Sequence, residues 1–414
     1  MRKNIYFRLS AYFFFFFVSW SACYSLFAIW LGQEIHLNGE ATGLIFAVNA
    51  AFTLIMQPLY GFISDKLGVR KDLLTYLSAI LIFAGPFFIF VYGPLLKFNV
   101  LLGAIVGGLY LGVGYLASIG AVESYIEKIS RKYDFEYGRA RMWGSLGWAV
   151  MTFFAGQLIN INPNYNFWIS SIASTIMFLI ILTTKVEVTE VEAKKAQSVT
   201  VKDVFNLFKL KDFWFFIVFV LGVTCVYGVY DQQFPRYFAE QFATVKLGNQ
   251  MFGYLNSFQV FLEAGMMFLA PKIVNKLGAR NSLLLAAFLM AFRMTGSGIV
   301  TGPILISLMK LIHSFELPIL LVSVFKYLDA NFESRLSSIL YLVGYQFAGQ
   351  IGTIGLSSLV GKMYDSFGFK ITYLYLGIFV LTFAVIAVFT LKKGDSQLAA
   401  DDSTDMKLQN KEKL

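Results

Sequence analysis

Two stretches of the chain, GFISDKLGVRK at residues 61–71 and PKIVNKLGARN at residues 271–281, share the pattern Lys-Leu-Gly-x-Arg. Each stretch follows the second long apolar run in its half of the chain. Taken alone, such a pattern is typical of a polar turn in which the glycine ends a helix. Because it recurs at matching positions, it predicts a chain built from two similar halves.

The composition predicts a membrane protein. Of the 414 residues, 57% are hydrophobic, only 14% are charged, and the mean hydropathy is +0.65. A soluble protein carries roughly a quarter charged residues. The net charge of +9 does not indicate nucleic-acid binding, because the cations lie in short segments between apolar runs, as in cytoplasmic loops. Cys23 and Cys225 lie in different apolar runs, so no disulfide is indicated.

Twelve apolar runs approach the roughly 20 residues that a helix needs to cross a bilayer. We predict spans at residues 9–31, 42–63, 73–93, 99–122, 141–160, 167–184, 213–238, 251–271, 282–300, 304–327, 337–360 and 371–391. The more basic loops are placed on the cytoplasmic side with both termini. They hold Lys66, Arg70, Lys71, Lys128, Arg131, Lys132, Arg139, Lys272, Lys276, Arg280, Lys326 and Arg335.

The predicted architecture is an all-α membrane protein with the major-facilitator fold, in which two six-helix halves surround a central cavity. The halves comprise residues 1–184 and 213–393. A cytoplasmic linker (185–212) joins them, and a cytoplasmic tail (394–414) follows the second half.

Ionisable residues inside spans cost ~2.5–3.5 kcal/mol or more each, so they line polar cavities or pair with one another. The predicted spans and their ends hold eight: Glu123, Arg141, Asp231, Glu263, Arg293, Lys310, His313 and Glu316. A structural salt bridge accounts for Asp231 with Lys310 but not for the whole set. With His313 neutral, four acids face three permanent cations. A buried carboxylate without a counter-charge takes up a proton, which favours a proton-coupled carrier.

Two groups of residues predict how the cavity is used. Lys310, His313 and Glu316 recur every three residues and share one helix face, where we expect the proton to be held on Glu316. Arg141 and Trp148 lie two helical turns apart on one face.

The arginine offers a fork of donors to neighbouring sugar hydroxyls, Glu123 offers an acceptor, and the tryptophan offers an apolar face to a sugar ring. A lone Trp in a span is more often an anchor or a packing residue. Beside Arg141 and Glu123, the sugar-binding interpretation is favoured. Phe17 and Trp20 could add aromatic contacts, although packing explains any single aromatic residue of the Phe-rich first span.

At these residues the chain resembles the oligosaccharide:proton symporters, the family of the lactose and sucrose permeases, over nearly its whole length. The resemblance is carried by FISDKLGVRK at 62–71, FEYGRARMWG at 135–144, YDQQF at 230–234, KLIHSFELP at 310–318 and FKYL at 325–328.

The resemblance implies a role for each matching residue. The sugar-binding group of the first half is matched by Glu123, Arg141 and Trp148. The proton-coupling group is matched by Tyr227, Arg293, His313 and Glu316, with Glu316 as the proton carrier. Asp231 and Lys310 match an interhelical ion pair, and Asp65 belongs to a cytoplasmic gate motif.

Three departures separate the chain from the lactose permease. Val260 stands where that protein has a carboxylate, and the acid here is Glu263, one turn later. Gly228 and Gly349 replace a charge pair, and Ser145 replaces a cysteine near the sugar. The first two features resemble the sucrose permease. The resemblance therefore implies sucrose as the substrate, with a galactoside such as lactose, melibiose or raffinose as the alternative.

Other function classes fit the sequence less well. A drug-efflux antiporter of the same fold would not need so polar a cavity, and a membrane sensor would need a signalling domain. The sequence contains no phosphate-binding loop, Cys/His metal spacing or nucleophile–base–acid set. We therefore expect no enzyme activity, cofactor or metal. The expected partners are a disaccharide, a proton and the lipid bilayer, for a monomer in the bacterial cytoplasmic membrane.

Overall fold

The computed structural model of the protein describes residues 2–186, 208–332 and 340–393. Within these ranges the regular elements are all helical and no strand occurs. Most of the predicted linker 185–212 and the whole of the predicted tail 394–414 fall outside the described residues.

Helices and short π-helical segments (η) succeed one another along the chain. The first half contains α1 (Arg2–Tyr24), α2 (Phe27–Gln33), α3 (Gly39–Leu67), α4 (Asp72–Leu81), α5 (Ala84–Pro86), η1 (Phe87–Tyr92), α6 (Gly93–Phe98), α7 (Val100–Leu111), η2 (Gly112–Leu116), α8 (Ser118–Lys132), α9 (Tyr137–Ile161) and α10 (Asn164–Thr183). The second half contains α12 (Lys211–Phe219), η4 (Val220–Thr224), α13 (Cys225–Ala239), α14 (Val245–Leu277), α15 (Ala279–Ile299), α16 (Pro303–Asn331), η6 (Leu340–Phe347) and α18 (Ala348–Thr390).

The described helices account for all twelve predicted spans. By length and composition, nine helical segments could cross a membrane, or ten if α4 and the bent run after it form one span. The segment that ends with α18 contains two predicted spans, because the chain turns at Gly368, whose φ of 77° lies outside helical geometry. The remaining predicted span is α9. Its polar and small residues make it less apolar than the nine segments counted above.

The helices extend further than their apolar runs, which corrects the predicted boundaries. Several cations assigned to loops lie within the last two turns of helices: Lys66 in α3, Lys128, Arg131 and Lys132 in α8, Lys272 and Lys276 in α14, and Lys326 in α16. Hydropathy detects only the part of a helix that faces hydrocarbon, whereas backbone hydrogen bonding continues into the polar ends.

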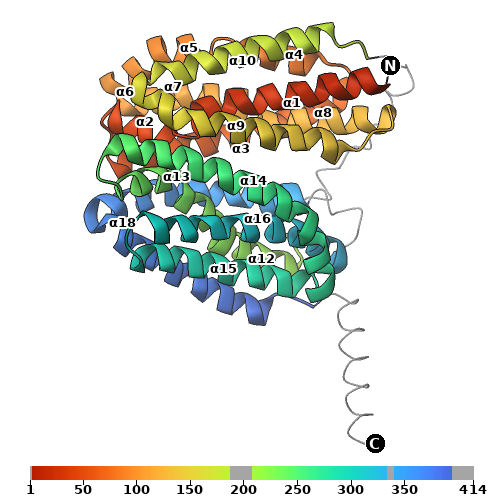
Figure 1. The fold of residues 1–414 in the computed structure, drawn as a ribbon. Coiled ribbons are helices and arrows are strands. Elements are labelled where there is room, and N and C mark those ends of the chain that lie inside the picture. The colour runs from red at the N-terminus through yellow and green to blue at the C-terminus, as the bar shows by residue number, and fades with distance from the viewer. Residues whose placement is uncertain (1, 187–207, 333–339, 394–414) are drawn as a thin grey trace, which may run out of the picture.

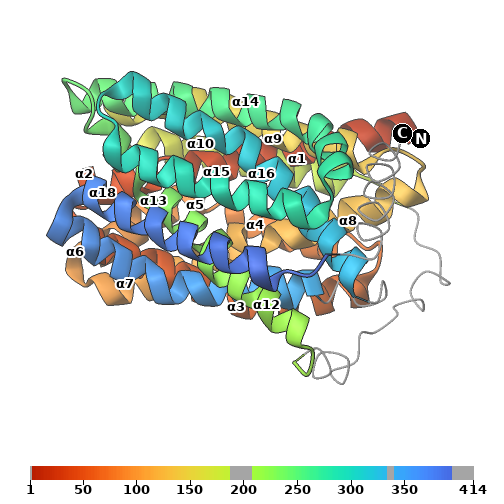
Figure 2. The ribbon, with the colours of Figure 1, turned by 90° about the horizontal axis from the view of Figure 1, so that it is seen from below.

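The two halves form two layers (Figure 1). In the first, α1 packs on α9 and α10, and in the second, α15 packs on α16 and α18. The layers meet along two helix pairs, α3 with α18 and α9 with α14. The start of α1 and the end of α18 lie at the same end of the molecule (Figures 1 and 2), as an even number of spans requires.

In each half, a cation in or directly after the Lys-Leu-Gly-x-Arg pattern contacts the end of the last span. Gly68 and Gly278 have positive φ values of 59° and 82°, so glycine suits both turns. Beyond the first turn, the Lys71 ammonium donates to three carbonyl groups at the end of α10, at 2.7–2.9 Å. Beyond the second, Arg280 donates to the carbonyl groups of the last turn of α18 and of Leu391 after it. Cations satisfy the free carbonyl groups at helix C-termini.

Glycines let the halves touch at one end of the molecule, beside the turn between α2 and α3. A Cβ on Gly43 of α3 would lie 2.1 Å from the backbone oxygen of Ser357 in α18. One on Gly156 of α9 would lie 2.2 Å from the backbone oxygen of Asn249 in α14. Cβ atoms essentially never approach other atoms within 3 Å, so only glycine allows these contacts.

A glycine elsewhere on each of the same four helices makes no such contact. A Cβ added at Gly61 of α3, Gly138 of α9, Gly265 of α14 or Gly349 of α18 would meet no described atom within 4 Å. The space between the two halves is therefore closed at the α2–α3 end.

Polar contacts between the halves reinforce the closed end. The Asp365 carboxylate of α18 accepts the backbone N–H groups of Gly39 and Glu40 at 2.7 and 2.8 Å, and so caps the N-terminus of α3. The side chains of Gln33 and Asn249 exchange two hydrogen bonds, at 3.1 and 2.9 Å.

Candidate functional site

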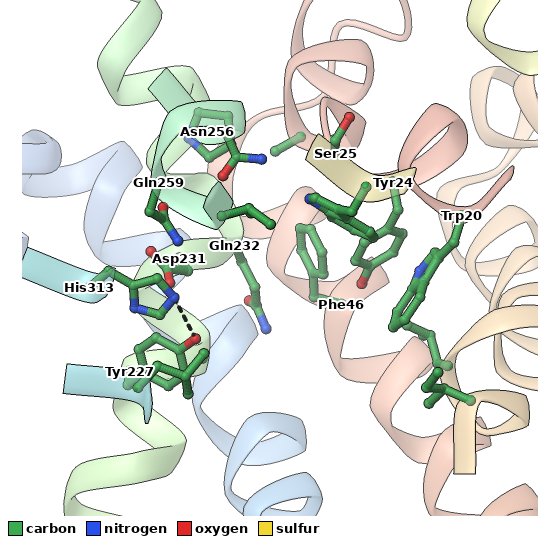
Figure 3. Close-up of a pocket in the computed structure, with 18 of the residues that line it drawn as sticks. Trp20, Tyr24, Ser25, Phe46, Tyr227, Asp231, Gln232, Asn256, Gln259 and His313 are labelled. Carbon is green, nitrogen blue, oxygen red and sulfur yellow. Dashed lines mark hydrogen bonds between the residues drawn. The ribbon is translucent and has the colours of Figure 1, made fainter. Parts of the chain in front are cut away.

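A cavity of about 650 Å³ lies between the two halves, within the size range of small-molecule sites. Of the predicted site residues, Phe17, Trp20, Arg141, Ser145 and Trp148 line it from the first half. Tyr227, Asp231, Glu263, Lys310 and His313 line it from the second half. Figure 3 shows Trp20, Tyr24 and Phe46 on one side of the pocket and polar residues of α13, α14 and α16 on the other.

Arg141 is the cation of the first-half wall. Its Nε donates to Glu123 Oε1 at 2.6 Å, and its Nη1 lies 3.5 Å from the hydroxyl oxygen of Ser145. The guanidinium also stacks on the ring of Phe17, at 4.5 Å from the ring centroid. Glu123 itself is not among the lining residues and reaches the cavity through Arg141. The predicted Arg–Glu pair is therefore present, and it holds one edge of the arginine fork in place.

Aromatic rings form the wall beside Arg141. Trp148 and Trp20 meet edge to face, with ring centroids 5.3 Å apart, and Phe17 lies 5.6 Å from Trp20 and 6.4 Å from Trp148. α1 and α9 pack along each other, which brings these rings together. The arrangement places a broad apolar surface next to a cation. A pyranose ring matches such a wall, because C–H groups cover one face of the ring and hydroxyls surround its edge.

The second half carries a buried ion network. Lys310 donates to Asp231 at 2.8 Å, as predicted, and Arg293 donates to the same carboxylate oxygen at 3.2 Å. Arg293 is fully buried on α15. Its Nη2 lies 2.6 Å from Glu316 Oε1, a charge contact outside hydrogen-bond alignment. Arg293 therefore bridges two carboxylates from different helices.

Glu316 lies behind the cavity wall and is fully buried. Besides the Arg293 contact, Glu316 Oε1 lies 3.2 Å from Nδ1 of His313, one helical turn away. The carboxylate therefore lies between a titratable imidazole on its own helix and a permanent cation that tertiary packing brings from α15.

His313 connects Glu316 to the cavity. Its Nε2 is 3.2 Å from the Tyr227 hydroxyl, and the two rings stack with centroids 5.0 Å apart (Figure 3). The same nitrogen lies 4.0 Å from Glu263 Oε2. Among the described ion pairs, Asp231 and Glu316 each contact a permanent cation, whereas Glu263 contacts only this histidine.

Three polar residues of the cavity wall were not predicted from the sequence. Asn256, Gln259 and Gln232 line the cavity, although none was predicted. Their signal was the spacing of Asn256 and Gln259 from Glu263, which places all three on one face of α14. Asp65 lies in α3, but its side chain is outside the described part of the structure.

A metal site was not expected. Among the described residues, no cluster of three or more His, Cys, Asp or Glu side chains could hold a metal ion.

The family model and the relatives of known function agree on one family. Residues 1–403 match the model of the LacY proton/sugar symporter family. The chain is 44% identical to the lactose permease of Citrobacter freundii over 377 residues, covering 89% of this chain and 90% of that protein. It is 39% identical to the sucrose permease of Escherichia coli over 401 residues, covering 96% and 97%. The solved structure of the nucleoside transporter NupG matches with a TM-score of 0.79 at 14% identity, covering 94% of this chain and 99% of that one.

Proposed function

Because the chain belongs to the LacY proton/sugar symporter family, we propose that it imports a disaccharide together with a proton across the bacterial cytoplasmic membrane. The family consists of transporters, so the chain is a multi-pass membrane carrier driven by the proton gradient and not by a cofactor. The family and the all-α major-facilitator fold predicted from the sequence are confirmed. The assignment of roles to individual residues stays part of the proposal.

The observation that carries the proposal is one cavity with two different walls. Arg141, held by Glu123 beside Trp148, provides donors and an apolar face for a sugar ring. On the opposite wall, His313 touches both the cavity and the buried Glu316. Sugar and proton therefore occupy adjoining groups, and adjoining groups can bias one shared conformational equilibrium.

The proton is assigned to Glu316, with His313 and Arg293 controlling its release. In the arrangement observed, the Arg293 guanidinium lies against the Glu316 carboxyl group. Protonation of Glu316 removes one of the two negative partners of Arg293 and leaves Asp231 as the other. The cycle then requires Arg293 to move away from Glu316 when the proton is bound and to return when it leaves.

The closed end supports alternating access. If both termini are cytoplasmic, as the proposal holds, the α2–α3 end faces outward and the cavity is shut on that side. Import then needs a second state in which the glycine contacts between α3 and α18 and between α9 and α14 separate. No contact with another copy of the chain is needed for this movement, so we propose a functional monomer.

Sucrose is the first substrate to test. Gly228 and Gly349 leave open space where a Cβ would project, and Gly228 lines the cavity, so no charge pair occupies this position. Glu263 also lines the cavity, one turn beyond Val260.

A galactoside is the second candidate, because overall identity to a lactose permease (44%) exceeds that to a sucrose permease (39%). Drug efflux is less well supported, because lipophilic drugs do not need the charged groups that line this cavity.

Uptake measurements test the proposal. Transport-deficient cells that express the chain are given labelled sucrose, lactose or melibiose while the external pH is recorded. At least one disaccharide should accumulate, and its addition should make the medium more alkaline. Disaccharide uptake without a pH change would refute proton coupling, and no uptake of any disaccharide would refute the substrate class. Lactose uptake that excess sucrose does not inhibit would remove sucrose as the substrate.

A further inference from the structure

One wall of the cavity carries two neutral polar side chains, Asn256 and Gln259, that the proposed mechanism does not use. Asn256, Gln259 and Glu263 follow one another at spacings of three and four residues, so they share one face of α14. All three line the cavity, and Figure 3 shows Asn256 and Gln259 across the pocket from Trp20 and Tyr24. Glu263 was predicted from its charge, whereas the two carboxamides gave no such signal.

Gln259 is buried without satisfying its hydrogen-bonding capacity. Only 3% of its surface is exposed, and its Oε1 has no hydrogen-bond partner among the described residues. Its backbone carbonyl accepts a hydrogen bond from the Ser314 hydroxyl at 3.0 Å, which ties α14 to α16 at this point. The carboxamide is therefore held on a fixed element beside the cavity, with a buried oxygen that has no hydrogen-bond partner among the described residues. Such an atom is costly unless a ligand or water meets it.

The chemistry of a carboxamide suits a sugar hydroxyl. The group contains both an acceptor and two donors, and a hydroxyl is itself donor and acceptor, so the two pair in either amide orientation. Asn256, one turn away and 9% exposed, offers a second group of the same kind. Both side chains are neutral, so they can bind a sugar hydroxyl without adding a charge to the cavity.

We propose that Gln259 and Asn256 form a subsite for the second glycosyl unit of the disaccharide. This inference rests on the proposed function, in which Arg141 and Trp148 on the opposite half hold the first unit. The subsite makes the carrier prefer disaccharides over single hexoses, because only the longer sugar reaches both halves of the molecule. It also makes recognition of the second unit independent of proton coupling.

The test compares two sugars in the same variants. Gln259→Leu and Asn256→Leu replace each carboxamide by an apolar side chain of similar size. Phe258→Leu is the matched control, because Phe258 lies on the same helix with 52% of its surface exposed. Affinities are measured by sugar-for-sugar exchange in membrane vesicles. The sugars are the disaccharide that the wild type accumulates and the methyl glycoside of the hexose that it binds, either methyl α-D-glucopyranoside or methyl β-D-galactopyranoside.

We expect each carboxamide variant to bind the disaccharide about tenfold more weakly, as the loss of one or two hydrogen bonds predicts. Affinity for the methyl glycoside should stay within about twofold, which also shows that the variant is folded. The number of protons carried per disaccharide should not change, and Phe258→Leu should match the wild type. Equal weakening of both sugars, or no weakening of the disaccharide, would overturn the inference.

The proposed function can survive that result. If Arg141→Lys loses both sugars while Gln259→Leu behaves as the wild type, the first-half site stands and only the second subsite falls. If the wild type takes up no disaccharide, the proposed function fails and the subsite fails with it.

Discussion

Replacing Arg141 by lysine tests the sugar site most directly, because the charge is kept while the shape is lost. The guanidinium donates from Nε to Glu123 at 2.6 Å and stacks on Phe17 at 4.5 Å. These contacts hold one edge of the fork and orient the plane, so the other N–H groups remain to meet neighbouring sugar hydroxyls. Lysine offers a single ammonium on a flexible stem and cannot present two parallel donors.

The size of the effect follows from the bonds that lysine cannot make. A hydrogen bond to a charged group contributes about 1.5–3 kcal/mol, and lysine keeps one of the two sugar contacts at best. The stacking on Phe17 that orients the group adds about 0.5–1 kcal/mol. The loss is then about 2–4 kcal/mol, which weakens sugar binding by a factor of about 30–1000.

Sugar binding to the purified protein and sugar-for-sugar exchange in vesicles measure this loss. The matched control is Arg139→Lys, since Arg139 lies two residues earlier in α9 and is exposed. The control should bind as the wild type does. Both variants should unfold at similar temperatures, because a lysine at 141 can still pair with Glu123 and residue 139 is exposed. An Arg141→Lys protein whose affinity stays within about threefold of the wild type would refute the role given to the arginine fork.

Other contacts give predictions of the same kind. Glu316→Gln should keep sugar-for-sugar exchange but accumulate no sugar under a proton gradient; normal accumulation would place the proton on another carboxylate. Gly361→Leu puts a side chain where a Cβ is already 2.1 Å from the Gly39 backbone oxygen, so transport should fall at least tenfold while sugar binding persists, and normal transport would contradict tight closure. Asp231→Asn leaves Lys310 without its carboxylate partner, so it should lower the free energy of unfolding by about 3–5 kcal/mol, as measured by thermal unfolding. Lys310→Met should cost less because Asp231 keeps its arginine contact, and equal losses would contradict this asymmetry.

The sequence predicted the fold because membrane spans have a strong one-dimensional signal. Every apolar run of about 20 residues corresponds to a helical segment, since a chain in hydrocarbon must satisfy its backbone groups internally. The helix ends were harder to predict. Lys128 and Lys276 continue α8 and α14 beyond the bilayer core, where hydropathy no longer distinguishes a helix from a loop.

The sequence predicted which residues form the site better than it predicted the contacts between them. Charge inside a span is rare enough to identify Arg293 and Glu316 one at a time, and the i, i+3 spacing placed His313 beside Glu316. The contact between Arg293 and Glu316 joins two different helices, so no spacing along the chain reveals it. Gln259 was missed because a neutral amide in a span carries no charge signal, although in the structure it is buried beside the cavity with an unpaired oxygen.

The pairing changes what the charge count means. The carboxylates of the second half do not share the cations evenly. Among the described ion pairs, Asp231 and Glu316 each contact a permanent cation, whereas Glu263 pairs with His313 alone. We propose that His313 transmits between the two ends of this chain of contacts. A sugar hydroxyl that hydrogen-bonds to Glu263 alters the partner at one ring nitrogen, and the other ring nitrogen faces Glu316 at 3.2 Å.

Sugar binding and proton affinity are then coupled through one imidazole, and the coupling must be reciprocal: sugar raises proton affinity by the same factor by which the proton raises sugar affinity. Measuring the pH dependence of sugar affinity and the sugar dependence of proton uptake in the same preparation checks that equality. Replacing His313 by Gln should reduce both factors together, because both pass through its ring. A His313→Gln variant that kept the full coupling factor would show that sugar and proton communicate by a different route.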